Sequence, residues 1–333
     1  MYENPVVEDL IISITDRCNL NCAHCFKGGA GTEELPLRVI KKLIDEAVGY
    51  GLKRVDYSGG ESFLYSQLDE LIEYSKQYPD IEYGFITNGL LVSESMLDKI
   101  SELPHVYIQI SMDGASKTTY ERVRGEGTFE SFMSALELIK AHRIKHKRTR
   151  TVVNSVNYVE IPDMYRLAIS HGMLPSFLFA AEEGNATENW EWLNLPDIKK
   201  IHVNNMISQL NKTYNLPVGM ISPGGGCDLS NGRERKLFAV GADGKVFFCD
   251  YLLDQPLGNL EKESLAEILK GDVMQHLYEN ESKRVEGLKE KCDKCVLFSE
   301  CRYGCPGEAR LHNDYSMCQY KKLFFACLTN QYI

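Results

Sequence analysis

Residues 6–25 read VVEDLIISITDRCNLNCAHC and join a strand pattern directly to three closely spaced cysteines. Residues 6–15 are rich in β-branched side chains, which predicts a β-strand. Cys18, Cys22 and Cys25 follow this strand with the spacing C-x3-C-x2-C. Parallel α/β proteins bind their ligands in the loops at the carboxyl ends of the strands. The stretch therefore predicts an α/β protein whose chemistry begins in this loop.

Strand and helix patterns alternate from residue 6 to about residue 181, which predicts parallel strands joined by crossover helices. The strand patterns are VVEDLIISIT (6–15), RVDYS (54–58), IEYGFIT (81–87), VYIQISM (106–112), RTVVNS (150–155) and PSFLFAA (175–181). The helix patterns are LRVIKKLIDEAVGY (37–50), LDELIEYSKQY (68–78), SESMLDKISEL (93–103), FMSALELIKAH (132–142) and IPDMYRLAISHG (161–172). Six units fall short of the eight in a closed TIM barrel. We therefore expect an open, partial (β/α)6 TIM-like barrel.

Composition excludes several classes of protein. The 333 residues carry a formal charge of -10, which argues against a nucleic-acid binder. No apolar run approaches the roughly 18 residues of a membrane span. The first strand pattern is not preceded by a basic stretch, so it does not resemble a secretory signal. We expect a cytoplasmic protein without a membrane partner, and we interpret the basic run at 142–150 as a solvated helix end and loop rather than a docking surface for an acidic partner.

The 11 cysteines fall into two groups, which indicates metal or redox chemistry rather than a disulfide scaffold. Three lie at positions 18–25, residues 26–226 contain none, and the other eight lie between Cys227 and Cys327. Three thiolates leave one iron of a four-iron cluster without a protein ligand. Zinc is the alternative for both groups, although His24 lies too close in sequence to complete a site with the first three cysteines.

Polar residues and glycines follow each predicted strand, where they are expected to share one rim of the barrel. They are Asp16-Arg17-Cys18, Gly59-Gly60-Glu61, Thr87-Asn88-Gly89, Ser111-Met112-Asp113, Asn154 and Glu182-Glu183-Gly184. Turn formation explains Asn88-Gly89 as well as a functional role does. Turns do not require Cys18 or Glu61, so these two are candidates for function.

The loop CNLNCAHC resembles the signature of the radical S-adenosylmethionine (radical SAM) superfamily. The resemblance implies that Cys18, Cys22 and Cys25 hold a [4Fe–4S] cluster whose open iron binds SAM. It further implies reductive cleavage of SAM to methionine and a 5′-deoxyadenosyl radical, which abstracts hydrogen from a substrate.

The same resemblance assigns SAM contacts to residues that follow the strands. Ser58-Gly59-Gly60-Glu61 matches the GGE motif for the SAM amino group, although Ser62 replaces the usual proline. Ser111 and Asp113 match a segment near the ribose and carboxylate of SAM, and Arg124 matches an arginine that pairs with that carboxylate. His24 stands at a position near the adenine, and Asn154 matches a polar position after strand five. No adenine motif is recognisable after strand six.

The C-terminal cysteines resemble a SPASM domain, which carries auxiliary iron–sulfur clusters in many radical SAM enzymes. The resemblance implies that Cys227, Cys249 and Cys305 hold a first auxiliary [4Fe–4S] cluster. It assigns a second to four further cysteines, for three clusters in all: Cys292, Cys295, Cys301 and Cys318. Members of this family commonly carry a further cysteine shortly after the position of Cys227, and this chain lacks it. The first cluster then has an open iron, or Cys327 or a non-cysteine group is its fourth ligand. Cys327 can also be explained as a buried apolar residue.

The resemblance implies an enzyme that modifies a ribosomally made peptide. We expect a radical SAM oxidoreductase of peptide maturation that forms a thioether or another crosslink. Alternatives are a sulfatase-type maturase that forms formylglycine, a peptide epimerase, and a non-enzymatic iron–sulfur or zinc scaffold. Asp250 matches the base of the sulfatase maturases, and a turn-forming aspartate explains it about equally well.

The expected partners are a peptide or protein substrate and a low-potential electron donor such as flavodoxin or ferredoxin. A separate leader-binding protein is a further candidate, because only some ten residues precede the first strand. We expect the partial barrel at 1–190, a connecting segment at 191–226 and the SPASM domain at 227–333. Oxygen-sensitive clusters imply an anaerobic cytoplasm.

Overall fold

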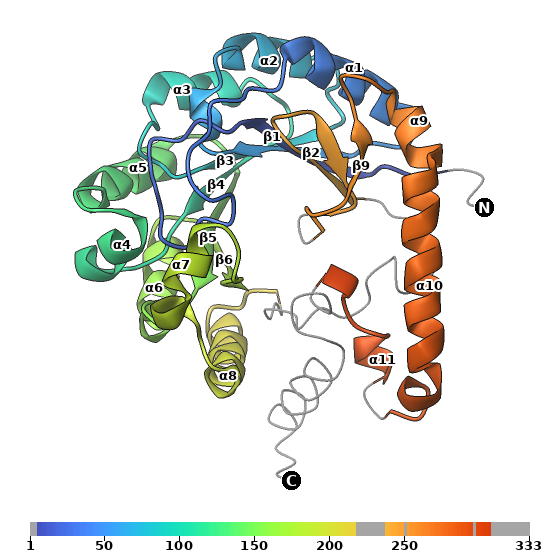
Figure 1. Cartoon of the computed structure of the whole chain (residues 1–333). Helices are drawn as coiled ribbons and strands as arrows, with labels where there is room; N and C mark the ends of the chain where they lie inside the picture. The colour runs from blue at the N-terminus through green and yellow to red at the C-terminus, as the bar shows by residue number, and fades with distance from the viewer. Residues whose placement is uncertain (1–4, 218–236, 250–251, 296–297, 308–333) are drawn as a thin grey trace.

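The computed structural model describes residues 5–217, 237–249, 252–295 and 298–307 (Figure 1). Its centre is a curved sheet whose first six strands follow one another in chain order and run parallel. These strands are β1 (Asp9–Thr15), β2 (Arg54–Gly59), β3 (Glu82–Thr87), β4 (Val106–Ser111), β5 (His146–Val153) and β6 (Leu174–Phe179). β6 forms one edge of the sheet and does not pair back to β1. The expected open, partial (β/α)6 barrel is confirmed.

Helices cover the outer face of the barrel (Figure 1). They are α1 (Leu37–Val48), α2 (Leu68–Ser75), α3 (Glu94–Ile100), α4 (Lys117–Arg124), α5 (Phe129–Ala141) and α6 (Ile161–Ser170), with short 3-10 turns η1 (Ser62–Leu64) and η2 (Tyr158–Glu160). Two more helices follow β6, namely α7 (Asn185–Leu193) and α8 (Asp197–Thr213). Every helix pattern expected between the strands is present, whereas α4 and α7 were not anticipated.

The outward side chains of the strands form the core. Leu10, Ile12, Val55, Tyr57 and Phe85 are each at most 1 % exposed, and they pack among the apolar residues of the helices. Burial of one such side chain contributes about 1.5–3 kcal/mol, so this layer is the main source of stability for the barrel. The alternate residues point into the barrel and are mostly polar and half-buried.

Three further strands extend the sheet beyond β1. They are β7 (Leu237–Val240), β8 (Lys245–Phe247) and β9 (Pro256–Asn259). β7 pairs parallel with β1, with Asp9 opposite Leu237, while β8 and β9 continue antiparallel. One sheet therefore contains strands from both sides of the expected domain boundary at 226/227. The position of this boundary stays a prediction.

Three helices follow β9, namely α9 (Leu265–Lys270), α10 (Asp272–Cys292) and α11 (Phe298–Cys301). α10 stands to one side of the barrel (Figure 1). On α10, the buried Glu281 carboxylate accepts two hydrogen bonds from the half-buried Arg284, at 2.7 and 2.8 Å. Arg284 also donates to the Tyr303 carbonyl at 3.0 Å. This pair ties α10 to the chain beyond α11.

We expected the whole basic run at 142–150 to form a solvated helix end and loop, but only its first part does so. Residues 146–150 belong to β5. Thr149, Thr151 and Val153 are buried on the outer face, and their β-branched side chains favour the strand despite the intervening charges. Arg148 points the other way and stacks on the Tyr107 ring, 4.4 Å from its centroid.

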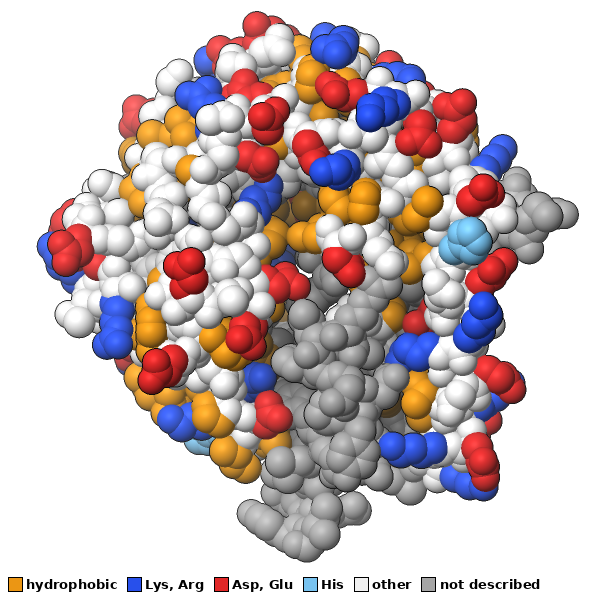
Figure 2. Space-filling view, in the orientation of Figure 1, with side chains coloured by type: hydrophobic (Ala, Val, Ile, Leu, Met, Phe, Trp, Pro, Cys, Tyr) orange, Lys and Arg blue, Asp and Glu red, His pale blue; other side chains and the backbone are white. Residues whose placement is uncertain are grey.

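Acidic and basic side chains are interspersed over the outer helices on the face that Figure 2 shows. Typical pairs are Lys99 with Asp69, 2.6 Å apart, and Lys42 with Glu46, 3.7 Å apart. Exposed pairs of this kind contribute about 0–1 kcal/mol each, so they do not decide the fold.

A charged layer crosses the inside of the barrel near the amino ends of the strands. Arg54 lies 3.2 Å from the Asp9 carboxylate, and the Tyr107 hydroxyl donates to Asp56. Burial raises the pKa of Asp56, although the hydrogen bond from Tyr107 and the charge of Arg54 oppose this effect. Gly84 makes room for the layer, because a Cβ there would lie 2.3 Å from Tyr107 Cζ and 2.6 Å from Asp56 Oδ1.

We expect Gly84→Ala to lower the free energy of unfolding by about 1–3 kcal/mol, since the ring and the carboxylate must both shift. Urea unfolding followed by circular dichroism measures the change. Gly287→Ala in α10 is the control, because a Cβ there meets no atom within 4 Å. In that open helical position alanine stabilises by about 0.5–1 kcal/mol. An equal effect of the two substitutions would contradict the steric role of Gly84.

Candidate active site

The cysteine loop connects β1 to α1 and contains three free, half-buried thiols at Cys18, Cys22 and Cys25. The Cys25 amide donates to the Cys22 carbonyl at 3.1 Å, which folds the last part of the motif into a turn. Burial raises the pKa of the Cys18 thiol, and it raises the pKa of Cys22 to about 11 although Arg124 opposes it. No group of three Cys, His, Asp or Glu side chains within the described ranges is arranged to hold a single metal ion.

Gly59 and Gly60 let the end of β2 lie directly against the start of this loop. A Cβ at Gly59, whose φ is +150°, would lie 2.2 Å from the Thr15 carbonyl oxygen. One at Gly60 would lie 2.4 Å from the carbonyl oxygen of Arg17. The Gly60 amide donates to the Thr15 carbonyl at 2.7 Å, and the Glu61 amide donates to the Arg17 carbonyl at 2.8 Å. The glycine pair is therefore required for the contact between β2 and the cysteine loop.

Glu61 is completely buried at the end of β2. Its carboxylate accepts hydrogen bonds from Thr87 Oγ1 at 2.7 Å, the Asn88 amide at 2.7 Å and the Phe63 amide at 3.2 Å. Burial raises its pKa, and the hydrogen bonds from Asn88 and Thr87 oppose this effect. Glu61 thus links β2 to the end of β3.

Asn88 belongs to this site although turn formation explained it equally well in the sequence. Its side-chain nitrogen donates to Asn19 Oδ1 at 2.7 Å and lies 4.0 Å from the Cys18 sulfur. Its position after the third strand was the available signal. Asn88 connects the buried Glu61 to the first cysteine of the loop.

A second buried cluster joins the cysteine loop to β4 and α4. Asp113 is fully buried and accepts from Arg124 Nε at 2.6 Å, while His24 Nε2 lies 3.3 Å from the same carboxylate oxygen. Arg124 Nη1 also lies 3.9 Å from the Cys22 sulfur. Burial lowers the pKa of the Arg124 guanidinium, but the negative charge of Asp113 has the larger opposite effect, so this pKa is raised overall. Burial lowers the pKa of His24, which therefore favours its neutral form.

The remaining predicted SAM contacts lie on the strands or in local turns. Ser58 faces Ser13 across β1 and β2, and Ser111 faces Arg150 across β4 and β5. Asn154 is fully buried, and its Oδ1 accepts from the Val156 amide at 2.9 Å. The structure therefore brings His24, Asp113 and Arg124 together, whereas Asn154 uses its side chain to form a turn.

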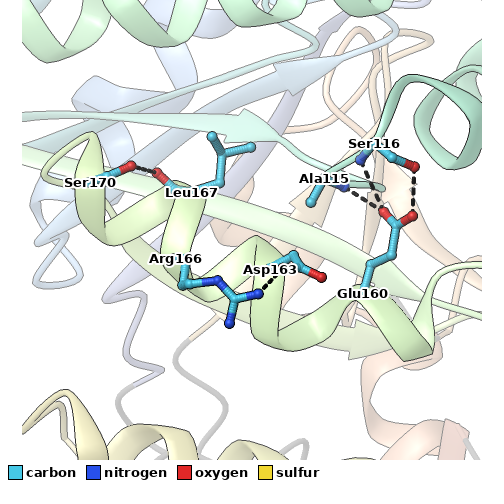
Figure 3. A pocket seen from close by; sticks show the side chains of 7 residues that line it. All are labelled: Ala115, Ser116, Glu160, Asp163, Arg166, Leu167 and Ser170. Carbon is cyan, nitrogen blue, oxygen red and sulfur yellow. Dashed lines mark hydrogen bonds and ion pairs between the residues drawn. The ribbon is translucent and has the colours of Figure 1, made fainter.

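A surface pocket of about 440 Å³ lies between the start of α4 and helix α6 (Figure 3). It contains no predicted site residue. Glu160 in this pocket accepts from the amides of Ala115 and Ser116 at 2.8 and 3.1 Å. Burial opposes the ionised form, but hydrogen bonds from Ser116, Thr119 and the backbone hold the pKa of Glu160 below its ordinary value. The carboxylate lies at the N-terminus of the helix that carries Arg124, where Ser116 is the capping residue and a negative charge is favourable.

The C-terminal cysteines are described only in part. Cys249 is 8 % exposed just after β8, and Cys292 ends α10, with the Cys295 amide donating to its carbonyl at 2.9 Å. Cys301 and Cys305 flank three residues with positive φ, namely Arg302 (44°), Tyr303 (67°) and Gly304 (76°). Cys227, Asp250, Cys318 and Cys327 lie outside the described residues.

Comparison with known families identifies two parts of the chain. Residues 12–168 match the radical SAM superfamily, and residues 227–296 match the SPASM iron–sulfur cluster-binding domain. The chain carries a radical SAM domain followed by a SPASM domain. The three cysteines and the buried Glu61, Asp113 and Arg124 all lie within the first match. The expectation of a radical SAM enzyme is thereby confirmed.

Two characterised proteins illustrate the range of relatives. The chain is 25 % identical to the mycofactocin maturase MftC of Mycolicibacterium smegmatis over 308 residues, which cover 88 % of this chain and 76 % of the relative. It is 27 % identical to the GTP 3',8-cyclase of Chlorobaculum tepidum over 175 residues, which cover 52 % and 53 %. The first similarity spans both domains, whereas the second covers only half of each chain.

Solved structures share the fold over nearly the whole chain. The structure of anSMEcpe with bound AdoMet aligns with a TM-score of 0.74 at 22 % identity and covers 98 % of both chains. The Streptococcus suis protein SuiB bound to the precursor peptide SuiA aligns with a TM-score of 0.69 at 15 % identity, covering 92 % of this chain and 73 % of SuiB. Within the described part of the chain, no helix is long and apolar enough to span a bilayer.

We expect Asp113→Asn to lower the free energy of unfolding of the cluster-free chain by about 3–5 kcal/mol, because the buried Arg124 loses its counter-charge. Urea unfolding under anaerobic, reducing conditions measures the change. Asp69→Asn, which removes the partner of exposed Lys99, is the matched control and should cost about 0–1 kcal/mol. Similar losses in the two variants would show that the Asp113–Arg124 pair is not a structural centre of the site.

Proposed function

We propose that this chain is a radical SAM peptide maturase in which Cys18, Cys22 and Cys25 hold a SAM-binding [4Fe–4S] cluster. The observation that carries the proposal is the attachment of this loop to two buried carboxylates, Glu61 and Asp113, at the carboxyl ends of the strands. When bound, the cluster supplies the electron that cleaves SAM to methionine and a 5′-deoxyadenosyl radical.

The donor set fits a cluster rather than a closed zinc site. The loop offers three free thiols, and the nearest imidazole, that of His24, is turned toward Asp113 at 3.3 Å. A closed zinc site requires four ligands, whereas a four-iron cluster with three thiolates keeps one iron open. The loop residues therefore support SAM chelation at the fourth iron.

We assign the SAM contacts to the predicted residues around this loop. Gly59 and Gly60 allow close approach of backbone to the ligand, and Glu61 supplies negative charge for the SAM amino group. Arg124 supplies the positive charge for the SAM carboxylate while Asp113 orients it at 2.6 Å. The remaining contacts belong to Ser58, Ser111, His24 and Asn154, of which His24 shares the Asp113 carboxylate.

A peptide substrate is favoured by the relatives and by the inside of the barrel. MftC is a maturase, and SuiB has been solved with its precursor peptide. On the inner face of the strands, Ser13 lies opposite Ser58, and Arg150 lies between Ser111 and Ser176. The hydroxyls of Ser13 and Ser176 and the guanidinium of Arg150, which are not assigned to SAM, can hydrogen-bond the polar backbone of a peptide. We propose that the enzyme abstracts hydrogen from one residue of such a peptide and closes a thioether or another crosslink.

We further propose two auxiliary [4Fe–4S] clusters, which brings the total to three. Cys227, Cys249 and Cys305 hold the first, with an open iron or Cys327 as the fourth ligand. The second is held by Cys292, Cys295, Cys301 and Cys318. In the second set, the 2.9 Å hydrogen bond from the Cys295 amide to the Cys292 carbonyl forms a tight turn, which brings these two cysteines close together.

A formylglycine-forming maturase is the second candidate. It is supported by the likeness to anSMEcpe over 98 % of both chains and by Asp250, placed by the sequence beside Cys249 as a candidate base. A peptide epimerase is a third outcome of the same radical chemistry. The electron would come from flavodoxin or ferredoxin, and a separate leader-binding protein would present the peptide in an anaerobic cytoplasm.

We expect reconstituted wild-type protein with dithionite to convert SAM into 5′-deoxyadenosine, and we expect Cys22→Ala to abolish this conversion. The loss follows because two thiolates no longer hold the SAM-binding cluster. Liquid chromatography with mass spectrometry measures the product. Ser170→Ala, an exposed position in the α6 pocket, is the control. Cleavage at the wild-type rate in Cys22→Ala would overturn the proposal.

Mass spectrometry of a candidate peptide co-expressed with the enzyme under anaerobic conditions distinguishes the reactions. Loss of two hydrogens per modification with fragments that stay joined indicates a crosslink and locates the bond, whereas the same loss confined to one serine indicates formylglycine. An unchanged mass with deuterium taken up from heavy water indicates epimerisation. Formylglycine formed in a sulfatase substrate, and lost with Asp250→Ala, favours the second candidate.

A further inference from the structure

Helix α7 begins against the cysteine loop (Figure 1). The Asn185 amide donates to the Cys25 carbonyl at 2.8 Å. The Asn185 side-chain nitrogen donates to the Cys22 carbonyl at 3.0 Å and to Asn21 Oδ1 at 2.7 Å. One residue of α7 therefore bonds the carbonyls of two of the three cysteines, 160 positions earlier in the chain.

Asn189 extends this contact by one turn of the helix. Its side-chain nitrogen donates to the Ala23 carbonyl at 3.2 Å and to the Asn185 carbonyl at 2.9 Å. The Trp192 indole, which can only donate, bonds Asn189 Oδ1 at 3.2 Å and so turns the amide nitrogen toward the loop. Trp192 is itself covered by Arg122, 5.3 Å from the ring centroid. The orientation of Asn189 is thus determined by its neighbours.

Gly184 allows the chain to enter α7 at this distance from the loop. Its φ is +57°, and a Cβ there would lie 2.4 Å from the Cys25 carbonyl oxygen and 2.5 Å from the Gly28 amide nitrogen. Any side chain would push the start of α7 away from the loop. The backbone before the helix and the two asparagines therefore form one continuous contact.

The cysteine loop depends on such contacts because it has no helix or strand of its own between Asp16 and Gly31. Besides α7, the backbone partners of its central part are the Val123 carbonyl, which accepts from the Ala23 amide at 2.9 Å, and groups within the loop. By holding the carbonyls of Cys22, Ala23 and Cys25, α7 restricts the backbone dihedral angles that direct the cysteine side chains. α7 therefore helps to determine where Cys22 and Cys25 point, together with the contact of Arg124 with Cys22.

We propose that Asn185 and Asn189 are positioning residues that clamp the cysteine loop in the geometry that accepts the cluster. The proposal rests on the proposed function for the cluster, but the clamp itself is a property of the cluster-free chain. It assigns to α7 a role that the sequence motifs do not indicate, because the residues after strand six match no recognised pattern.

Hydrogen–deuterium exchange of the reduced, cluster-free chain tests the clamp directly. In the double variant Asn185→Ala/Asn189→Ala, we expect the amides of Ala23, Cys25 and Gly28 to exchange about tenfold faster, since three side-chain hydrogen bonds to the loop are lost. Glu188→Ala, on the exposed face of α7, is the matched control and should leave this exchange unchanged. Unchanged exchange in the double variant would overturn the clamp.

Asn185→Asp and Asn189→Asp separate the hydrogen bonds from the size of the side chain. A carboxylate in place of the amide cannot donate to the carbonyls, so both variants should exchange faster although their volume is unchanged. Wild-type exchange in both aspartate variants would show that α7 acts only by packing, which contradicts the proposal. Exchange of amides in the β2–β4 core serves as the check that the fold is intact.

Cluster retention tests the link to the proposed function. After anaerobic reconstitution, we expect a chelator to remove the SAM-sensitive electron paramagnetic resonance signal about tenfold faster from the double variant than from wild type or Glu188→Ala. Faster exchange with equal retention would overturn the claim that the clamp serves the cluster. Faster exchange in a chain that binds no iron even as wild type would support the clamp and contradict the proposed function instead.

Discussion

The backbone hydrogen bonds from Gly60 and Glu61 to the carbonyls of Thr15 and Arg17 are the constraint on which the rest of the site depends. They hold the cysteine loop at the level where β2 and β3 end. A side chain at either glycine would separate the two segments. Once the loop lies there, Glu61 and Asn88 fix its first half, while Asp113 and Arg124 meet the second half through Cys22 and His24.

This arrangement places two ionisable groups where water is largely excluded. Glu61 and Asp113 are both fully buried, and each accepts several hydrogen bonds, whereas only Asp113 has a cation in direct contact. Buried charges are tolerated when they are paired and hydrogen-bonded. The different surroundings suit the roles that we propose, because Asp113 orients Arg124 in advance and hydrogen bonds from Thr87 and Asn88 hold the Glu61 carboxyl group at the end of β3.

The sequence predicted the six-stranded barrel because each strand and most outer helices carry their own periodic pattern of apolar residues. It also predicted His24, Asp113 and Arg124 as members of one site, and the structure places His24 and Arg124 on the same carboxylate oxygen of Asp113, at 3.3 and 2.6 Å. It did not predict α4, since KTTYERVR has only two apolar residues, and it missed α7 although Ala186, Trp190 and Leu193 have helical spacing. The contacts of Asn185 and Asn189 could not be predicted from a local pattern either, because they join residues some 160 positions apart. The basic run in β5 was misread because charged side chains inside a barrel resemble those of a solvated loop.

The pairing of β7 with β1 has a consequence for how the chain reaches its fold. β1 leaves the ribosome long before β7, and the edge of Asp9–Ile12 that faces β7 lacks this strand partner until residues 237–240 have been made. An uncovered strand edge can pair with other chains, and contacts between residues far apart in sequence form slowly. Synthesis of β1 to β6 therefore precedes the protection of this edge, and a nascent chain that stops before β7 exposes β1 to aggregation. The strand β7, which lies within the SPASM match, thus covers the edge of the barrel only once synthesis has passed residue 240.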